Sequence, residues 1–316
     1  MINTGELVDR ARAQEPRAVG RLISLVENAS PELRVVAAAL APYTGHARVI
    51  GLTGPPGVGK STSTSALVTL LRAQGKRVGV LAVDPSSPFS GGALLGDRIR
   101  MREHATDPGV FIRSMATRGH LGGLSWATPQ ALRVLDAAGF DVVLVETVGV
   151  GQSEVDVAGL ADTTVVLLAP GMGDGIQAAK AGILEIADVF VVNKADRPGA
   201  DATVRDLKNM VAMSRRGVAG PSWRQPIVPT VASTMDGMAD VVTAMDAHQS
   251  WLVERGLLAD RRFHRARAEV EAIALEAVKA RIDGPGEDAL RDLAVQVAAG
   301  AIDPYSAADR LVEDLT

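Results

Sequence analysis

A glycine-rich segment that ends in lysine and serine is the first place where this chain could do chemistry. Residues 54–61 read GPPGVGKS, which matches G-x-x-x-x-G-K-[ST], between a β-branched run and a helix-length segment. Such glycines turn successive backbone N–H groups toward one anion, and the following helix adds the positive end of its dipole. Lys60 would reach the β- and γ-phosphates, and the Ser61 hydroxyl would bind Mg²⁺. We therefore expect a nucleotide phosphate to bind here, through Gly54, Pro55, Pro56, Gly57, Val58, Gly59, Lys60, Ser61 and Thr62.

A second motif, Asn193-Lys194-Ala195-Asp196, directly follows the apolar run VFVV. It matches N-K-x-D, the guanine-recognition pattern of GTPases. A carboxylate such as that of Asp196 can accept hydrogen bonds from N1–H and the exocyclic amino group of guanine, whereas adenine has an acceptor at N1 and no amino group at C2. Asn193 and Lys194 are expected to brace the loops around the base. The motif predicts GTP or GDP as the bound nucleotide.

Three carboxylates between these motifs are candidate ligands for Mg²⁺ or for a water in its shell. Asp84 ends the run VGVLAVD, Asp97 lies in the glycine-rich segment after it, and Glu146 follows the run DVVLV. Carboxylates at the carboxyl ends of strands beside a phosphate-binding loop are well placed for a hard cation. We predict a magnesium site made from Ser61, Asp84, Asp97 and Glu146.

The segment Glu146-Thr147-Val148-Gly149 stands where GTPases ordinarily carry Asp-x-x-Gly, whose glycine amide contacts the γ-phosphate. The longer side chain of Glu146 is expected to reach the Mg²⁺ shell through water, while Gly149 still senses the γ-phosphate. Lys60, Glu146 and Gly149 are therefore the predicted catalytic residues, for in-line attack of water on GTP.

The elements that must position these residues alternate between short β-branched runs and helix-length segments. Continuous apolar strands of this kind are typical of a parallel sheet that is buried on both faces. The pattern predicts an α/β fold with a doubly wound, mostly parallel sheet and helical N- and C-terminal extensions. The expected strands are residues 48–52, 78–83, 110–114, 141–145, 164–169, 189–193 and 227–231.

Three regions follow from this pattern. Residues 1–44 are predicted to form an N-terminal helical arm, 45–240 the nucleotide-binding domain, and 241–316 a C-terminal helical extension. Residues 236–282 read as one long amphipathic helix, followed by a second helical stretch over 287–315. The pattern leaves open whether the extension caps the domain or forms a dimerisation arm.

Composition excludes several classes of partner. The 316 residues include 33 basic and 37 acidic side chains, for a net charge of −4, which argues against a nucleic-acid-binding surface. The absence of cysteine excludes disulfides and thiolate metal sites. Residues 1–15 lack the features of a signal or transit peptide, and no apolar run approaches the roughly 18 residues that span a bilayer. We expect a soluble, cytoplasmic protein that binds neither nucleic acid nor membrane.

Together the motifs resemble the MeaB/ArgK-type GTPases, which include the methylmalonyl-CoA mutase-associated G-proteins. The resemblance implies a GTPase chaperone of an adenosylcobalamin-dependent acyl-CoA mutase, with methylmalonyl-CoA mutase as the best-known partner. In that family, binding and hydrolysis of Mg-GTP are coupled to cofactor loading and to protection of the mutase. The resemblance rests on residues 54–62, 83–101, 113–125, 146–154, 171–183 and 193–196.

The same resemblance implies further roles. Gln177 and Lys180 would lie in a third switch loop that responds to the partner, and Ser233 would back the guanine base. The C-terminal helices would form the dimerisation arm of a homodimer.

Three other functions are compatible with part of the pattern. A P-loop kinase linked to basic amino-acid transport could use arginines beside the phosphates, although the guanine motif counts against a kinase that uses ATP. A nickel-delivery GTPase would need clustered metal ligands, whereas this chain has no cysteine and five scattered histidines. A scaffold that binds GTP without turnover stays open, because intrinsic hydrolysis can be very slow.

Overall fold

The computed structural model describes residues 4–28, 30–84, 101–116, 127–147, 153–171, 185–214, 222–284 and 286–315. It divides into two compact units, residues 1–261 and residues 262–316. The division expected from the sequence, into residues 1–44, 45–240 and 241–316, stays a prediction.

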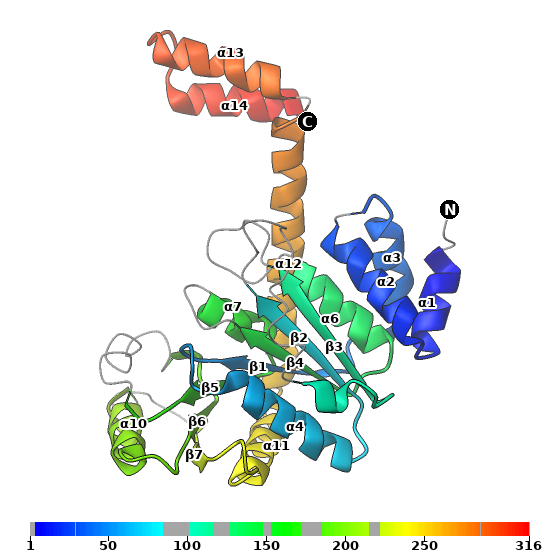
Figure 1. Cartoon of the computed structure of the whole chain (residues 1–316). Helices are drawn as coiled ribbons and strands as arrows, with labels where there is room; N and C mark the ends of the chain where they lie inside the picture. The colour runs from blue at the N-terminus through cyan, green and yellow to red at the C-terminus, as the bar shows by residue number, and fades with distance from the viewer. Residues whose placement is uncertain are drawn as a thin grey trace. The chain divides into compact units, whose positions relative to one another are not determined.

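The first unit is built around a sheet in which seven strands of the described residues all run parallel, in the order β3-β2-β4-β1-β5-β6-β7 (Figure 1). This confirms the predicted doubly wound α/β fold. The strands are β1 (Arg48–Thr53), β2 (Val78–Asp84), β3 (Val110–Ala116), β4 (Val142–Thr147), β5 (Thr163–Leu168), β6 (Val189–Asn193) and β7 (Ile227–Thr230).

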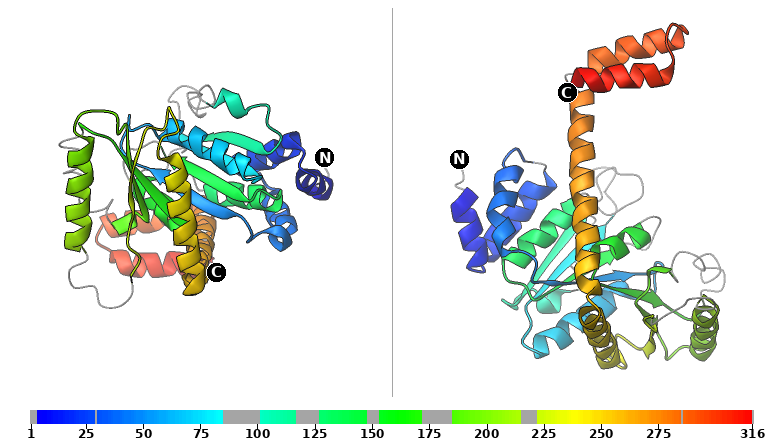
Figure 2. Two further views of the ribbon diagram at one scale, coloured as in Figure 1. Left: turned by 90° about the horizontal axis from the view of Figure 1, so that it is seen from below. Right: turned by 180° about the vertical axis from the view of Figure 1, so that it is seen from behind.

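Helices lie on both sides of this sheet, which is why most of the strand residues are apolar (Figure 2). Alternate strand residues point to opposite faces. Leu52 and Leu144 pack with α4 (Lys60–Ala73) and α11 (Met238–Glu254) on one face. On the other face, Val143 and Val145 pack with α6 (Ala127–Ala137) and α7 (Ser153–Leu160), and Phe190 packs with α10 (Ala200–Ser214).

The N-terminal extension consists of three helices that share a core with α6. These helices are α1 (Thr4–Arg12), α2 (Pro16–Glu27) and α3 (Leu33–Leu40), and the short turn η1 (Ala41–Tyr43) leads from them to β1. Their buried side chains include Leu22 and Ile23, which belong to the same apolar cluster as Leu135 of α6. An ion pair between Glu27 and Arg113 of β3 adds a polar connection to the sheet.

The C-terminal region contains more helices than the sequence predicted. The helix expected over residues 236–282 is two helices, α11 and α12 (Leu257–Ile282), because Gly256 at a φ of 71° interrupts the regular backbone. Gly300, at a φ of 70°, likewise separates α13 (Glu287–Ala298) from α14 (Pro304–Leu315). In the second unit, α13 and α14 bury a small cluster of Leu293, Ala307 and Leu311.

None of the helices in the described ranges is both long enough and apolar enough to cross a membrane.

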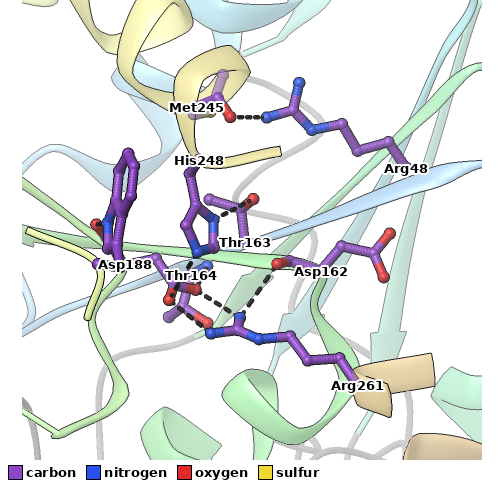
Figure 3. A network of polar contacts seen from close by, with 9 residues as sticks. Arg48, Asp162, Thr163, Thr164, Asp188, Met245, His248 and Arg261 are labelled. Carbon is purple, nitrogen blue, oxygen red and sulfur yellow. Dashed lines mark hydrogen bonds and ion pairs between the residues drawn. The ribbon is translucent and has the colours of Figure 1, made fainter. Parts of the chain in front are cut away.

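Asp188, just before β6, is the centre of a buried polar network at the amino-terminal edge of the sheet (Figure 3). Its carboxylate accepts two hydrogen bonds from the Arg261 guanidinium, each 2.8 Å long, and a third of 2.9 Å from the backbone N–H of Thr164. The Nε2 atom of His248 lies 3.2 Å from the same carboxylate. The network therefore holds Arg261, in the second turn of α12, against the edge of the sheet.

Aromatic and hydroxyl groups complete the surroundings of His248, which is fully buried. Its Nδ1 atom lies 3.0 Å from the Thr163 hydroxyl, and the ring centroids of Trp223 and Trp251 lie 4.9 Å and 6.2 Å away. Burial by itself raises the pKa of Asp188, but hydrogen bonds from His248 and Arg261 more than offset it, so the pKa lies below its ordinary value. Asp188 is therefore ionised at neutral pH.

We expect Asp188→Asn to lower the free energy of unfolding by about 3 kcal/mol at neutral pH, because it removes the buried charged acceptor of His248, which is fully buried, and of Arg261, which is partly exposed. The folded-state pKa is depressed, so the stabilisation is complete above the unfolded pKa of about 3.9 and is lost as pH falls through the folded pKa. The difference between wild type and variant should then shrink in acid. Urea unfolding followed by tryptophan fluorescence measures both effects.

The matched control is Asp246→Asn, which removes the carboxylate of an exposed ion pair with Arg48. It should cost less than about 1 kcal/mol. Equal losses for the two variants would contradict the role assigned to Asp188.

Candidate nucleotide-binding site

The glycine-rich loop connects β1 to α4 at the carboxyl edge of the sheet (Figure 1). Strand β1 lies between β4 and β5, so connections leave on opposite sides of the sheet at this point. Crevices at such reversals in strand order are where open parallel sheets bind ligands. The loop therefore lies where the fold favours a binding site.

Two glycines of the loop are required by close contacts. Gly54 has a φ of 140°, and a Cβ atom there would lie 2.1 Å from the carbonyl oxygen of Leu167 in β5. Gly59 has a φ of 96°, and a Cβ atom there would lie 2.4 Å from Nδ2 of Asn193. Gly57, at a φ of 78°, has open space around the same position. The loop backbone can thus lie against β5 and Asn193 only because it carries no side chain at residues 54 and 59.

Lys60 begins α4, and its side chain is buried. Its ammonium donates hydrogen bonds to the carbonyl oxygens of Gly54, at 2.7 Å, and Pro55, at 3.1 Å. The charge therefore lies inside the loop, beside the positive end of the helix dipole, where an anion would be stabilised.

Glu146 is a buried residue near the carboxyl end of β4 and contacts α4 through both of its carboxylate oxygens. The Ser61 hydroxyl donates a hydrogen bond of 2.7 Å to Oε1, and the Thr64 hydroxyl donates one of 2.8 Å to Oε2. A hydroxyl and a carboxylate are hard oxygen donors of the kind that Mg²⁺ prefers. Ser61 and Glu146 therefore fit the predicted magnesium site by residue type, and they lie within hydrogen-bonding distance of each other.

The sequence interpretation did not include Thr64. The helical spacing could have indicated it, because residues three apart on a helix share a face and Ser61 was already a predicted ligand.

Asn193 connects the loop to the segment after β7. Its Nδ2 donates to the carbonyl oxygen of Val58 at 2.8 Å, while its Oδ1 accepts hydrogen bonds from the Thr230 hydroxyl at 3.2 Å and from the backbone N–H of Ala232 at 3.0 Å. Lys194, at a φ of 60°, donates from Nζ to the carbonyl oxygen of Gly57 at 2.6 Å. These contacts join the two predicted motifs into one structure; their role in binding a base stays a prediction.

Asp196 and Ser233 follow β6 and β7 at the same edge of the sheet, and both side chains are exposed. Asp84 ends β2, also at this edge. The other predicted site residues, Asp97, Gly149, Gln177 and Lys180, lie outside the described residues. No group of three or more His, Cys, Asp or Glu side chains within the described segments could hold a metal ion.

A glycine-rich loop of the phosphate-binding pattern follows the central strand of an all-parallel sheet, and a motif of the guanine-recognition pattern contacts it. This combination defines the class of P-loop GTPases. Comparison with models of protein families shows which family of P-loop GTPases the chain belongs to. The family model "Methylmalonyl Co-A mutase-associated GTPase MeaB" matches residues 19–286, and the chain belongs to this family.

Individual relatives agree with this assignment. A protein of Pyrococcus horikoshii that is named as a GTPase is 48% identical over 310 residues, which cover 98% of each chain. The mouse protein "Methylmalonic aciduria type A homolog, mitochondrial" is 40% identical over 217 residues, 67% of this chain and 52% of its own. The crystal structure of a "LAO/AO transport system kinase" superposes with a TM-score of 0.72 at 26% identity, covering 100% of this chain and 99% of that one.

The contrast between two loop glycines gives a test of this geometry. We expect Gly54→Ala to cost more than about 3 kcal/mol of stability and to abolish tight binding of guanine nucleotides, because the new Cβ would collide with the backbone of β5. Gly57→Ala adds only the strain of a left-handed conformation, about 1 kcal/mol. Thermal unfolding and the affinity for a fluorescent GDP analogue measure the difference, and similar behaviour of the two variants would refute the close approach.

Proposed function

We propose that this GTPase couples binding and hydrolysis of Mg-GTP to cofactor loading and protection of an adenosylcobalamin-dependent acyl-CoA mutase. Methylmalonyl-CoA mutase is the first candidate client. The observation that carries the proposal is the family match over residues 19–286, since the family description itself associates these GTPases with that mutase. The mouse relative, whose name refers to methylmalonic aciduria, supports the same client.

In the proposed mechanism, backbone N–H groups of residues 57–60 and the Lys60 ammonium bind the phosphates of GTP, since Pro55 and Pro56 have no N–H to donate. The ammonium is held within the loop by the carbonyls of Gly54 and Pro55, so it is already near the position where negative charge would develop. Water would attack the γ-phosphate in line, with the Gly149 amide in contact with that phosphate.

Ser61 and Glu146 would hold Mg²⁺ together with Asp84 and Asp97. When bound, the ion would neutralise charge on the phosphates. Glu146 is buried, and its two oxygens accept hydrogen bonds from hydroxyls of α4, which hold the carboxylate toward that helix.

At the other end of the site, Asp196 would bind the guanine base and Ser233 would back it. The support is their common position at the carboxyl edge of the sheet, beside Asn193 and Lys194, which contact the loop. Gln177 and Lys180 would respond to the mutase as part of a switch loop. We place the protein in the cytoplasm, in agreement with its lack of cysteine.

We further propose that the C-terminal helices form the interface of a homodimer. Helix α12 buries none of its residues, although it carries large apolar side chains that are mostly exposed, among them Phe263 at 64% and Val270 at 68%. These two side chains are seven residues apart and therefore lie on the same side of the helix, and exposed apolar side chains on one helix face are typical of a protein–protein interface. A second copy of the chain is the partner that the family resemblance implies.

A kinase remains the second candidate, because the matching crystal structure is that of a protein described as a transport system kinase. A kinase would transfer the γ-phosphate to an acceptor other than water. The Asn193–Asp196 motif favours a guanine nucleotide and therefore the GTPase.

The decisive measurement is steady-state phosphate release from GTP and from ATP, with and without the adenosylcobalamin-dependent mutase of the same organism. We expect GTP-selective turnover that rises at least about tenfold with the mutase, because a partner can complete a GTPase site. Lys60→Ala, which removes the phosphate-binding ammonium, should abolish tight GTP binding and both rates.

Each other outcome has a clear meaning. A rate of GTP hydrolysis that the mutase does not change would contradict the proposal that the mutase is the client. A preference for ATP over GTP would contradict the proposal that the site binds guanine. Appearance of the γ-phosphate on an acceptor, with no free phosphate, would favour the kinase.

The homodimer is tested by light scattering of the purified chain. Wild type should have the mass of two chains, and Val270→Glu should shift it to one, because a charge within an apolar interface is unfavourable. Ala272→Glu is the matched control, since it adds the same charge about 200° around the helix and should stay dimeric. Dimers in all three samples would refute an interface at Val270.

A further inference from the structure

Thr64 is a buried residue of the site that lies outside the predicted motifs. We propose that Thr64 is a positioning residue, which orients the Glu146 carboxylate toward the magnesium ion of the bound nucleotide. This inference rests on the proposed function, because it concerns the magnesium site of that same GTPase. Thr64 acts through Glu146 and does not itself contact the nucleotide.

The first support is that two hydroxyls on α4 hold the two oxygens of one carboxylate. Ser61 and Thr64 are three residues apart and therefore share a face of the helix. Ser61 contacts Oε1 at 2.7 Å and Thr64 contacts Oε2 at 2.8 Å. Two separate bonds to two oxygens fix the plane of the carboxylate, which one bond cannot do.

The second support is that the backbone of Glu146 is already fixed. Glu146 pairs with Leu52 in the register of β1 and β4, and the hydroxyl of the next residue, Thr147, donates a hydrogen bond of 3.1 Å to the Thr53 hydroxyl. The remaining freedom lies in the side chain, which is one methylene longer than the aspartate common at this position. Thr64 restrains that additional rotation.

The third support is the choice of acceptor for the single Thr64 proton. The hydroxyl has two acceptors within reach, the carbonyl oxygen of Lys60 at 3.0 Å and Oε2 of Glu146 at 2.8 Å. The charged carboxylate is the stronger acceptor. Thr64 is 0% exposed and Glu146 3% exposed, so little water competes for this bond. Thr64 thus holds Oε2 and leaves Oε1 facing Ser61, the predicted magnesium ligand.

Thr64→Val tests the proposal, because it keeps the shape of the side chain and removes the hydroxyl. The measurement is the dissociation rate of a fluorescent GDP analogue as a function of free Mg²⁺. We expect the variant to need about tenfold more Mg²⁺ for half-maximal slowing of release, the loss typical of a hydrogen bond to a buried charge. In EDTA its release rate should equal that of wild type, and Thr64→Ser should restore the Mg²⁺ dependence.

Two controls on the same helix separate this effect from general damage to α4. Thr69→Val removes a hydroxyl of the same helix that donates a hydrogen bond of 3.1 Å to the carbonyl oxygen of Ser65, four residues earlier, and that contacts no carboxylate in the described structure. Ser63→Ala removes a buried hydroxyl for which the described structure shows no hydrogen-bond partner. Both should keep the wild-type Mg²⁺ dependence. In a Glu146→Gln background, Thr64→Val should change the Mg²⁺ concentration for half-maximal slowing by less than about twofold, because the two residues act as a pair.

The outcomes distinguish the inference from the function on which it rests. Wild-type Mg²⁺ dependence in Thr64→Val, or an equal change of release in EDTA, would overturn the positioning role and leave the GTPase intact. If Thr64→Val does not fold, the comparison of Thr64→Ser with Thr64→Ala decides in the same way. A wild-type chain that binds no GDP analogue at any Mg²⁺ concentration would overturn both.

Discussion

The structure of the site depends on one steric constraint, the contact between the glycine-rich loop and strand β5. The carbonyl oxygen of Leu167 occupies the space that a side chain at residue 54 would need. Because the loop can therefore lie flat against its neighbour, β1 continues into α4 within six residues, and Lys60 begins the helix with its ammonium inside the loop. The dipole of α4, the position of Ser61 and the reach of Glu146 all follow from that short connection.

Much of this arrangement could be predicted from the sequence, because it depends on local patterns. Each of the seven apolar runs became a strand whose bounds differ from the expected ones by at most two residues, since a strand covered by helices on both faces is apolar along most of its length. The sequence also predicted which strand ends carry the site residues, because the loop, Glu146 and the Asn193 motif each follow or end one of these runs. All of the described ones lie at the same edge of the sheet.

What could not be predicted depends on backbone conformation or on distant partners. Gly256 and Gly300 interrupt helical patterns that continue on either side, and composition does not reveal whether a glycine within such a pattern adopts a left-handed conformation. The partners of Asp188 are equally hidden, because Arg261 is 73 residues away and no local pattern connects the two. Thr64 is a different case: its spacing from Ser61 could have placed it on the same face of the helix, but its contact with Glu146 joins β4 to α4 and follows from no local pattern.

Asn193 illustrates how a single side chain can restrict what replaces it. Its amide donates to the carbonyl of Val58 and accepts from Thr230 and Ala232, so it acts as donor and acceptor toward two separate segments. Aspartate could accept but not donate, and a longer glutamine would have to fit where the amide already lies against Gly59. The tolerance of this position to substitution is therefore set by hydrogen-bond polarity and length together. A substitution at residue 193 would remove the connection between the phosphate loop and the segment that follows β7, even though neither of these segments had itself changed.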